Sequence, residues 1–385
     1  MRFPGFTDEW KTFSLGEKVI IKSGISPQCL CCDGNLPYYK VEQLNHCEKE
    51  LGETPYYGQT SANNIIPKGS IIFPKRGAAI MTNKVRVNAS ECILDTNLMA
   101  LIPDSTLYNH FLFYYVLNRE LGKIADTSTI PQINNVHINP LKIAIPIQFE
   151  EQRKIGNFLS LLDERIATQN KIIEDLKKLK SAIIDNLLGR VQTDESDRMV
   201  KLGEIGKFTR GLTYSAEDIV EDGGIVVARA NNLSNGEAVN LYNEIVRVDK
   251  PISDSQLLKY GDMVICMANG SSALVGKASY YNETTDSIAT IGAFCGIYRS
   301  DKKIVRWLLQ TNKYKRAIHK SLQGGNGAIA NLTPNDILGL SFIIPKQEPS
   351  IVVLLQGFDE KLDIEISLLH SLQKEKQYLL SQMFI

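Results

Sequence analysis

The sequence predicts an α+β protein with two tandem β-rich domains, each followed by a long helix. Three observations lead to this expectation. The chain has 385 residues, of which 43% are hydrophobic, so it is long enough for two sizeable cores. The order of motifs in the first half recurs in the second half. Each half ends in a long stretch whose apolar residues recur every three or four positions.

The repeat is visible in short strings at the start and middle of each half. Runs of β-branched and aromatic residues, interrupted by Gly, Pro and Asn, predict a β-rich globular part in each half. A shorter helix is expected near the end of each globular part, at about 108–124 and 302–322. The matching strings are residues 13–17 (FSLGE) with 200–204 (VKLGE), Gly24 with Gly211, residues 38–41 (YYKV) with 227–230 (VARA), and residues 69–73 (GSIIF) with 261–265 (GDMVI).

The two long helices, expected at about 150–188 and 349–384, carry the clearest pattern. In each helix, eight of ten positions at alternating steps of four and three are apolar, and the two polar breaks fall at the same steps. The positions are Ile155, Leu159, Leu162, Ile166, Gln169, Ile173, Leu176, Lys180, Ile183 and Leu187 in the first helix, and Ile351, Leu355, Phe358, Leu362, Glu365, Leu369, Leu372, Lys376, Leu379 and Met383 in the second.

This spacing is typical of a coiled-coil seam, and we favour pairing of the two helices with each other. The alternative is that each apolar stripe packs only on its own globular domain. If the helices run antiparallel with matched ends, residue numbers across the seam add to about 538. Gln169 would then face Leu369, and Lys180 would face Phe358. Such polar side chains must extend their polar ends to solvent or bind a polar group outside the two facing positions.

The expected boundaries follow from these patterns. The first β-rich domain covers residues 1–148 and the first long helix covers 149–190. A polar linker at 191–199 follows a glycine suited to ending a helix. The second β-rich domain covers residues 200–346, and the second long helix covers 347–385.

Charge and composition limit the classes of function. Lys and Arg number 43, and Asp and Glu also number 43, so any attraction to nucleic acid must come from local patches. The chain opens without an apolar run, and no stretch approaches the ~18 apolar residues of a membrane span. We therefore expect a soluble cytoplasmic protein whose seven cysteines are reduced.

Catalytic and metal-binding motifs are not apparent in the sequence. Residues 270–278 (GSSALVGKA) have the wrong spacing for a phosphate-binding loop and lack its Ser or Thr. No Asn-Pro-Pro-Tyr-type string of an amino-methyltransferase appears, and no glycine-rich cofactor loop follows an expected strand. The group Cys29, Cys31, Cys32, His46 and Cys47 has no zinc-finger spacing, so we expect free thiols and no metal.

At the start of the first long helix, residues 146–155 (PIQFEEQRKI) run on to 161–166 (LLDERI). This segment resembles the opening of the spacer helix in specificity subunits of type I restriction–modification systems. Residues 3–6 (FPGF) and 379–384 (LLSQMF) are also similar, and the resemblance covers essentially the whole chain. One departure is that residues 345–351 (PKQEPSI) lack the Glu-Glu-Gln string. The second helix then starts three residues later, which puts equal partner binding by the two helices in doubt or shows that the string is not essential for it.

The resemblance implies a function for each part. Each β-rich half would be a target recognition domain that reads one half of a bipartite DNA site, and the helices would form an antiparallel strut. Two modification subunits would bind the helices and methylate adenine N6 with S-adenosylmethionine. Restriction motor-nuclease subunits, which use ATP and Mg, would join for cleavage. This chain would have no catalytic residue and no cofactor of its own.

Candidate DNA-reading residues are polar side chains in loops, because Arg, Asn, Gln, Ser and Thr can reach base edges. Ordinary polar turns are the alternative interpretation. The helix expected at 302–322 is rich in Lys and Arg and would suit phosphate contact or a solvated face. The candidates are Lys75, Arg76, Thr129, Gln132 and Asn134 in the first half, and Arg229, Asn231, Asn232, Asn269, Ser271, Ser272 and Asn326 in the second.

Three other functions compete with this interpretation. A self-sufficient methyltransferase or nuclease would bind S-adenosylmethionine or metal as a single chain. A non-catalytic assembly scaffold would carry two β domains without reading DNA. A related DNA reader could serve another methylation-based phage defence system, which the neighbouring genes would distinguish.

Overall fold

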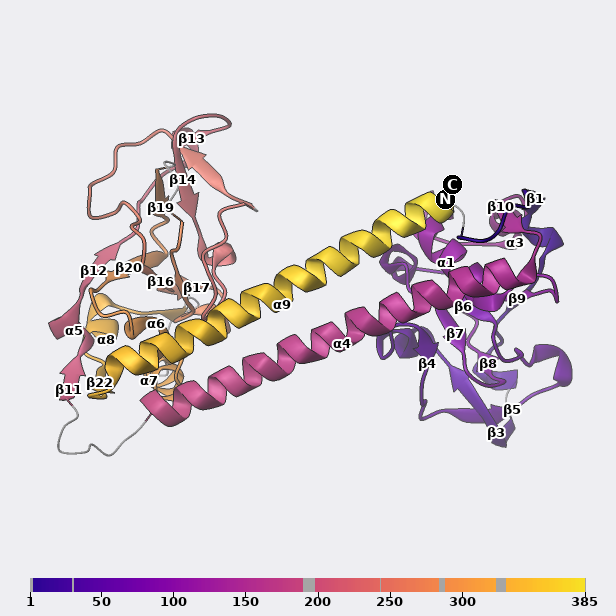
Figure 1. Ribbon diagram of the computed structural model, residues 1–385, viewed down its shortest axis with the longest axis horizontal. Helices are drawn as coiled ribbons and strands as arrows, with labels where there is room; N and C mark the ends of the chain where they lie inside the picture. Colours follow the sequence, from indigo (N-terminus) through magenta and orange to yellow (C-terminus); the bar gives the residue numbers. More distant parts are fainter. Residues whose placement is uncertain are drawn as a thin grey trace. The chain divides into compact units, whose positions relative to one another are not determined.

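The computed structural model describes residues 3–29, 31–189, 198–242, 244–283, 288–322 and 330–384, without the side chains of residues 29 and 31–33. The chain divides into two compact units. Unit 1 comprises Met1–Lys171 and Ser367–Ile385, and unit 2 comprises Ile172–Ile366. Each unit thus contains a globular part and a segment of both long helices, α4 (Phe149–Leu188) and α9 (Glu348–Met383), which are labelled in Figure 1.

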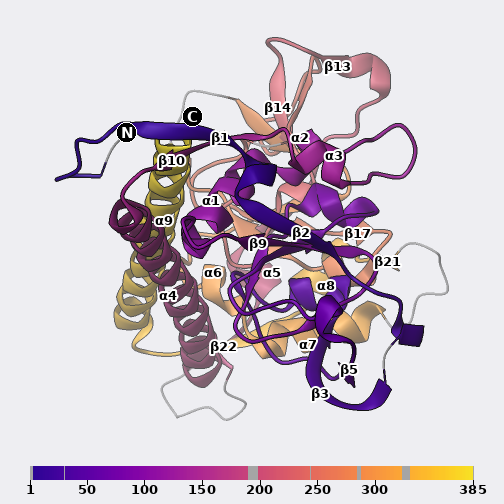
Figure 2. The ribbon, with the colours of Figure 1, turned by 90° about the vertical axis from the view of Figure 1, so that its right-hand side faces the viewer.

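Unit 1 is built on a five-stranded sheet in the order β2-β9-β6-β7-β4, with a three-stranded sheet β5-β3-β8 and the antiparallel pair β1-β10. Strands β2 and β9 are seen side by side in Figure 2. The strands are β1 (Trp10–Ser14), β2 (Val19–Ser23), β3 (Cys31–Tyr39), β4 (Glu50–Leu51), β5 (Tyr57–Gln59), β6 (Ile71–Pro74), β7 (Arg86–Asn88), β8 (Ile93–Leu94), β9 (Leu98–Pro103) and β10 (Lys142–Pro146). The short helices are α1 (Asn109–Arg119), α2 (Leu121–Ile124) and α3 (Asn135–Ile138).

Unit 2 contains two four-stranded sheets, β12-β20-β16-β18 and β13-β15-β14-β19, and the pairs β11-β22 and β17-β21. Its strands are β11 (Arg198–Lys201), β12 (Lys207–Arg210), β13 (Ile219–Val220), β14 (Ile225–Ala228), β15 (Val246–Val248), β16 (Met263–Cys266), β17 (Ala268–Asn269), β18 (Ala278–Tyr280), β19 (Ala289–Ile291), β20 (Cys295–Arg299), β21 (Ala330–Asn331) and β22 (Ser341–Ile344). The short helices are α5 (Leu202–Ile205), α6 (Val305–Leu308), α7 (Asn312–Leu322) and α8 (Pro334–Leu338).

The glycines that match in sequence occupy matching places in the two units. A Cβ at Gly24 would lie 1.9 Å from the carbonyl oxygen of Asp95, and one at Gly211 would lie 2.2 Å from that of Gly292. Gly24 also donates its N–H to Leu98, and Gly211 donates to Cys295. Only glycine allows the end of this strand to approach the neighbouring backbone so closely.

The long helices occur where the sequence predicts them, with 40 residues in α4 and 36 in α9. At 1.5 Å per residue these lengths are about 60 and 54 Å. Within unit 1, Leu159 and Leu162 of α4 belong to the same buried cluster as Leu372 and Leu379 of α9. The mixed α and β composition and the long helix α4 are therefore confirmed.

Both shorter helices expected from the sequence are interrupted. The first is divided into α1 and α2 at Glu120, which has a φ of +54° that cannot continue a right-handed helix. The second is divided into α6 and α7, where the hydroxyl of Thr311 accepts the N–H of Tyr314 at 3.1 Å and starts a new helix. Across the described ranges, no helix is long and apolar enough to cross a membrane.

Candidate nucleic-acid interface

In unit 1, the chain leaves β6 through Lys75 and Arg76, and backbone hydrogen bonds hold this turn. The N–H of Lys75 donates to Asn97, and its carbonyl accepts from Ile133. Arg76 is exposed and forms a backbone bridge with Gln132. Burial lowers the pKa of Lys75, and the positive charge of the neighbouring Arg76 lowers it further. The structure thus brings three candidate reading residues together on a rigid turn.

Two further candidates of unit 1 lie in the adjoining loop. Thr129 and Asn134 are both exposed. Asn134 directly precedes α3, and its N–H donates to Nδ1 of His137 at 3.0 Å. Its side chain is therefore presented at a fixed place, whereas Thr129 lies at the exposed tip of the loop.

In unit 2, Arg229 follows β14 and Asn231 follows two residues later, both with exposed side chains. Each is held by Glu244, because Nη2 of Arg229 donates to the Glu244 carbonyl at 3.0 Å and Nδ2 of Asn231 donates to its carboxylate at 2.7 Å. Asn232 is buried, and its Oδ1 accepts the N–H of Arg229 at 2.8 Å. We therefore assign Asn232 to stabilising the turn, where it cannot reach a base.

A cavity of about 680 Å³ brings together three of the candidates of unit 2. Arg229, Asn231 and Asn269 supply polar groups to its lining, while Tyr214 and Phe294 supply aromatic rings. Neither ring was identified from the sequence. The signal that could have found Phe294 is its position in the repeat, two residues after Gly292, the glycine that matches Asp95.

The loop after Asn269 continues toward α7. Ser271 is exposed and donates its N–H to Oδ1 of Asn269 at 3.0 Å. Ser272 lines a second cavity together with Lys315 and His319 of α7. Asn326 lies outside the described residues.

The basic segment of unit 2 serves two different roles. Lys302 is ion-paired with Glu348, and Arg306 is ion-paired with Asp359, so these cations stabilise the unit. In contrast, Lys315, Arg316 and Lys320 on α7 are exposed, and none of them pairs with a carboxylate among the residues placed by the structure. The exposed cations of α7 are therefore the part of the segment that best suits phosphate contact.

The long helices meet through two ion pairs, one inside each unit. Asp163 of α4 pairs with Lys376 of α9 in unit 1, at 2.5 Å, and Asp359 of α9 pairs with Lys180 of α4 in unit 2. In both pairs the residue numbers add to 539. The two lysines are two of the four polar breaks in the heptad pattern, and each meets a carboxylate next to the seam.

Each of these aspartates is also bound by an aromatic side chain of its own unit. The hydroxyl of Tyr114 donates to Asp163 at 2.5 Å, and burial with the nearby Asp163 charge raises the pKa of Tyr114. Nε1 of Trp307 donates to Asp359 at 3.1 Å. The carboxylates thus join the globular part of a unit to both long helices.

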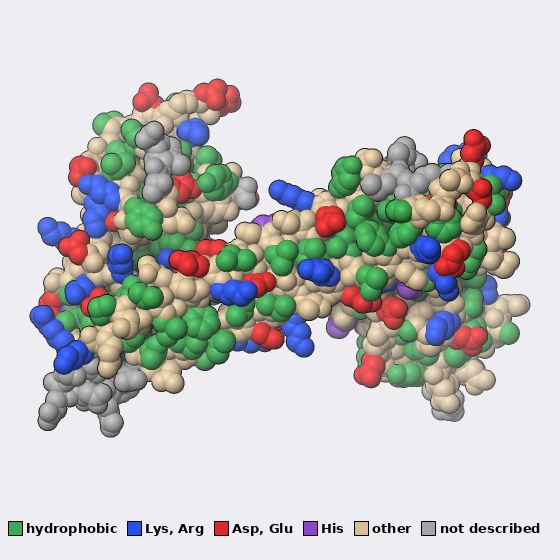
Figure 3. All heavy atoms as spheres, in the orientation of Figure 1, with side chains coloured by type: hydrophobic (Ala, Val, Ile, Leu, Met, Phe, Trp, Pro, Cys, Tyr) green, Lys and Arg blue, Asp and Glu red, His purple; other side chains and the backbone are tan. Residues whose placement is uncertain are grey.

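All sixteen apolar residues at the heptad positions of the two long helices are buried or half-buried. The long helices also carry exposed apolar side chains on the faces that do not form the seam. Figure 3 shows hydrophobic side chains, in green, along the exposed surface of the helices. Leu161 and Tyr378 are examples in unit 1, and Val353 and Ile364 are examples in unit 2.

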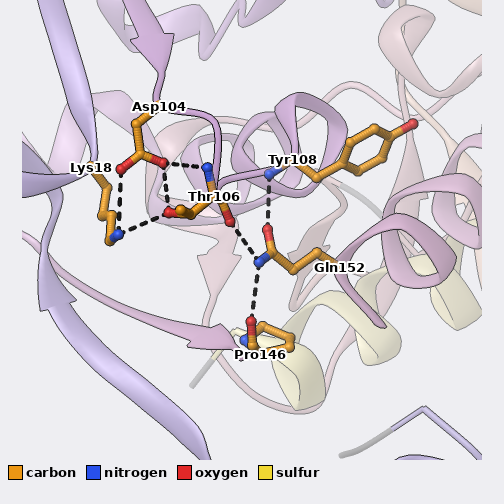
Figure 4. Close-up of polar contacts among 6 residues, drawn as sticks. All are labelled: Lys18, Asp104, Thr106, Tyr108, Pro146 and Gln152. Atoms are coloured by element: carbon orange, nitrogen blue, oxygen red, sulfur yellow. Dashed lines mark hydrogen bonds and ion pairs between the residues drawn. The ribbon is translucent and has the colours of Figure 1, made fainter. Parts of the chain in front are cut away.

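In the Glu-Glu-Gln string at the start of α4, Glu151 and Gln152 are buried within unit 1, whereas Glu150 is exposed. Gln152 is 1% exposed, and its Nε2 donates to the carbonyls of Thr106 and Pro146 at 2.9 and 3.0 Å (Figure 4). Its Oε1 accepts the N–H of Tyr108, the residue before α1, at 2.8 Å. Lys18 holds the same turn through Asp104 and Thr106. Gln152 therefore attaches α4 to β10 and to the start of α1.

Metal-ligand geometry does not appear in the described part of the chain. No group of three or more His, Cys, Asp or Glu residues within it could hold a metal ion. The side chains of Cys29, Cys31 and Cys32 lie outside the described residues. Cys47 is half-buried with a free thiol.

Comparison with known proteins points to one family. Residues 7–178 match the model of the type I restriction modification DNA specificity domain. The EcoKI specificity subunit of Escherichia coli is 30% identical over 164 residues, which cover 40% of this chain and 32% of that subunit. The MjaVIII specificity subunit of Methanocaldococcus jannaschii is 22% identical over 412 positions, covering 97% of this chain and 92% of that protein.

Two solved structures share the fold along the whole chain. The S subunit of a type I restriction–modification system from M. genitalium has a TM-score of 0.58 and 17% identity, covering 100% of this chain and 98% of that one. A chain from a structure of type I system assembly and conformational transition has a TM-score of 0.59 and 14% identity, with the same coverage. These likenesses show that the fold is shared along the whole chain.

Proposed function

Because this chain belongs to the family of type I restriction–modification specificity subunits, we propose that it reads a bipartite DNA sequence with one β-rich domain for each half-site. The proposed recognition domains are residues 1–148 and 200–346. The chain supplies sequence recognition to its complex and carries no catalytic residue or cofactor of its own. Methylation then depends on S-adenosylmethionine bound to a modification subunit, and cleavage on ATP and Mg bound to a restriction subunit.

A shared hydrogen-bonded frame with different side chains is the observation that best supports two reading domains. In unit 1, the N–H of Lys75 donates to Asn97, and its carbonyl accepts from Ile133. In unit 2, Met267 makes the same two bonds with Phe294 and Leu332. Loops of varied chemistry on a constant scaffold suit two domains that read different sequences.

We further propose that α4 and α9 pair as an antiparallel coiled coil. The ion pairs Asp163–Lys376 and Lys180–Asp359 support this arrangement, because a constant sum of residue numbers is what antiparallel helices require. The sequence-based register placed Lys180 opposite Phe358, one residue from Asp359. The pairing would keep the reading domains at a set separation, and helix length would then determine the spacing between half-sites.

The exposed apolar side chains on the long helices are the proposed docking surface for two modification subunits, with restriction motor-nuclease subunits joining the complex. Leu161 and Val353, in different units, are 63% and 68% exposed. Large apolar side chains gathered on a surface favour protein interfaces. Because Glu151 and Gln152 are buried within unit 1, we propose that these two residues of the Glu-Glu-Gln string serve folding and that docking does not use them.

The proposal is tested by co-expressing the chain with its modification subunit and sequencing the methylated DNA. A bipartite adenine-methylated motif is expected. Replacing residues 1–145 with those of another specificity subunit should change one half-site, and the reciprocal exchange of residues 200–346 should change only the other. If both half-sites stay unchanged in both exchanges, or if no motif is methylated, the proposed function is wrong.

The coiled-coil proposal has its own test. Four residues inserted near Gln169 in α4, matched by four in α9 beside Leu369, should lengthen the spacer between half-sites and leave their sequences intact. A methylated motif with an unchanged spacer would contradict a helix-determined separation. The double insertion is needed because one helix lengthened alone would break the register of the two ion pairs.

A further inference from the structure

The cavity of unit 2 is lined by a phenylalanine whose ring is largely exposed to solvent and is not packed into the core. Phe294 is 66% exposed and lies between β19 and β20, at the lining of the cavity. Its backbone is held firmly, since its carbonyl accepts from the N–H groups of both Met267 and Ala268 at 2.8 and 3.1 Å. The next residue, Cys295, is buried and paired with Cys266 across the sheet. A ring is therefore presented to solvent from a rigid turn.

The groups around this ring suit the edges of nucleobases. Arg229, Asn231 and Asn269 line the same cavity. Arginine offers two parallel donors to guanine, and asparagine offers a donor and an acceptor to adenine. Tyr214 provides a second ring in the same lining. Single exposed hydrophobic residues are common on proteins, but this one is surrounded by groups suited to base edges.

The size of the cavity also fits such a ligand. Its volume of about 680 Å³ can admit a nucleotide together with the tip of an inserted ring. Proteins that insert apolar rings between base steps unstack them, and bases also stack directly on aromatic side chains. Both contacts use the π face, which is available on Phe294.

Resting on the proposed function above, we propose that Phe294 is a specificity-determining residue that stacks on a base of the second half-site, with Arg229, Asn231 and Asn269 contacting base edges around it. Unit 1 carries no equivalent ring. The matching position is Asn97, whose N–H and Nδ2 both donate to Oδ1 of Asp95 at 2.9 Å. The two half-sites are thus read by different physical means.

The test uses the complete complex of this chain with its modification subunits and a duplex carrying the motif methylated by the wild-type complex. F294A and F294N remove the ring, and F294N installs the residue found in unit 1. F294Y keeps the stacking face. Y260A is the matched control, because Tyr260 is an aromatic side chain of unit 2 that is 71% exposed and lies outside this cavity.

Loss of the ring should weaken binding of the target duplex by roughly 10- to 100-fold, the usual effect of removing a stacked aromatic side chain. Methylated-DNA sequencing should show relaxed preference at one position of the second half-site and an unchanged first half-site. F294Y and Y260A should resemble wild type. Affinity is expressed as the ratio between target and unrelated duplexes, so that partial unfolding of a variant cancels.

Two results would overturn the inference. One is an F294A complex with the wild-type affinity ratio and motif, and the other is an F294Y complex as defective as F294A. A base analogue that fluoresces when it leaves the stack of its neighbouring bases, placed along the second half-site, gives an independent readout. Its signal should fall in F294A because the base returns to the DNA stack. If the wild-type complex itself prefers no bipartite duplex, the proposed function fails instead, which separates the two conclusions.

Discussion

The turn before β9 in unit 1 and the turn before β20 in unit 2 share a backbone but differ in chemistry. In unit 1, the turn carries Asn97 bound to Asp95, beside Lys75 and the exposed Arg76. In unit 2, it carries the exposed ring of Phe294. The backbone bonds that hold the turn are the same in both. The side chains at this turn can therefore differ between the halves while the sheet beneath it stays the same, as the proposed recognition of two sequences requires.

The two aspartates that join the long helices to the globular parts, Asp163 and Asp359, also occupy matching places, but they differ in burial. Asp359 of unit 2 receives Trp307, Arg306 and Lys180, whereas Asp163 of unit 1 receives Tyr114 and Lys376. The Asp359 side chain is 9% exposed, and that of Asp163 is 21% exposed. Three donors in a drier site make the anchor of unit 2 the more sensitive to disruption.

The largest effect is expected from removing Asp359. Asp359→Ala leaves the charges of Lys180 and Arg306 without their carboxylate, at a cost of about 3–5 kcal/mol in the free energy of unfolding. Asp163→Ala should cost less, about 1–3 kcal/mol. Urea unfolding of the full chain measures both.

Two controls accompany this comparison. Asp363 lies one turn beyond Asp359 and is exposed. Partial desolvation and the Asp359 charge raise the pKa of Asp363, so folding does not favour its charged form, and Asp363→Ala should change the free energy of unfolding little. The double variant Asp163→Lys with Lys376→Asp should recover most of the stability lost by Asp163→Lys alone. Equal losses for Asp359→Ala and Asp163→Ala would contradict the inferred difference between the anchors.

Next in size is the effect of the clamp at the start of α4. Gln152→Ala removes three hydrogen bonds and leaves the buried carbonyl of Pro146 unpaired, which should cost about 2–3 kcal/mol. Hydrogen exchange should show the loss as reduced protection in α1 and in the first turns of α4. Glu150→Ala, in the same string but exposed, should be nearly neutral. Similar unfolding curves for both variants would show that the buried glutamine contributes no special stability.

The fold could be predicted from the sequence where a pattern extends over many residues. The long helices follow from a heptad pattern repeated in two places, and the matched Gly24 and Gly211 marked a real close approach. The interruptions at Glu120 and Thr311 could not be predicted, because they depend on single backbone angles and caps. The two aspartates that receive Lys180 and Lys376 were not predicted, since they lie beside the apolar seam and their donors come from distant segments.

The candidate site was predicted only in part, for a similar reason. Polar residues in loops drew attention to Arg76, Arg229 and Asn269, and the structure brings the latter two to one cavity. Asn232 has the same composition signal, yet it is buried within the turn. Phe294 has the opposite signal, because an apolar residue between strands suggests a core position. Only burial distinguishes these cases, and burial is set by the fold.

A moderate effect is expected from the arginines that stand at the two reading turns. Arg76→Lys and Arg229→Lys keep the charge but lose the planar pair of donors. Each should reduce discrimination at one base pair of its own half-site by about 1–3 kcal/mol. Sequencing of methylated DNA reports the position affected. Arg153→Lys, on α4 and ion-paired with Glu150, is the control and should leave the motif intact. If Arg76→Lys or Arg229→Lys changed both half-sites, the proposal that each domain reads one half-site would be contradicted.

The smallest effect per residue, and the one that most sharply separates affinity from specificity, is expected on α7. This helix carries the exposed cations Lys315, Arg316 and Lys320 near Ser272 at the edge of the second cavity. The corresponding helix of unit 1 is the short α2, in which Lys123 is paired with Glu120. Each cation that contacts a phosphate releases about 0.9 of a counterion, so Lys315→Ala should lower the salt dependence of DNA binding by about that slope. Specific and unrelated duplexes should weaken equally, and the methylated motif should not change. Lys123→Ala in unit 1 should leave the slope unaltered. A changed motif in Lys315→Ala would instead assign α7 to base reading.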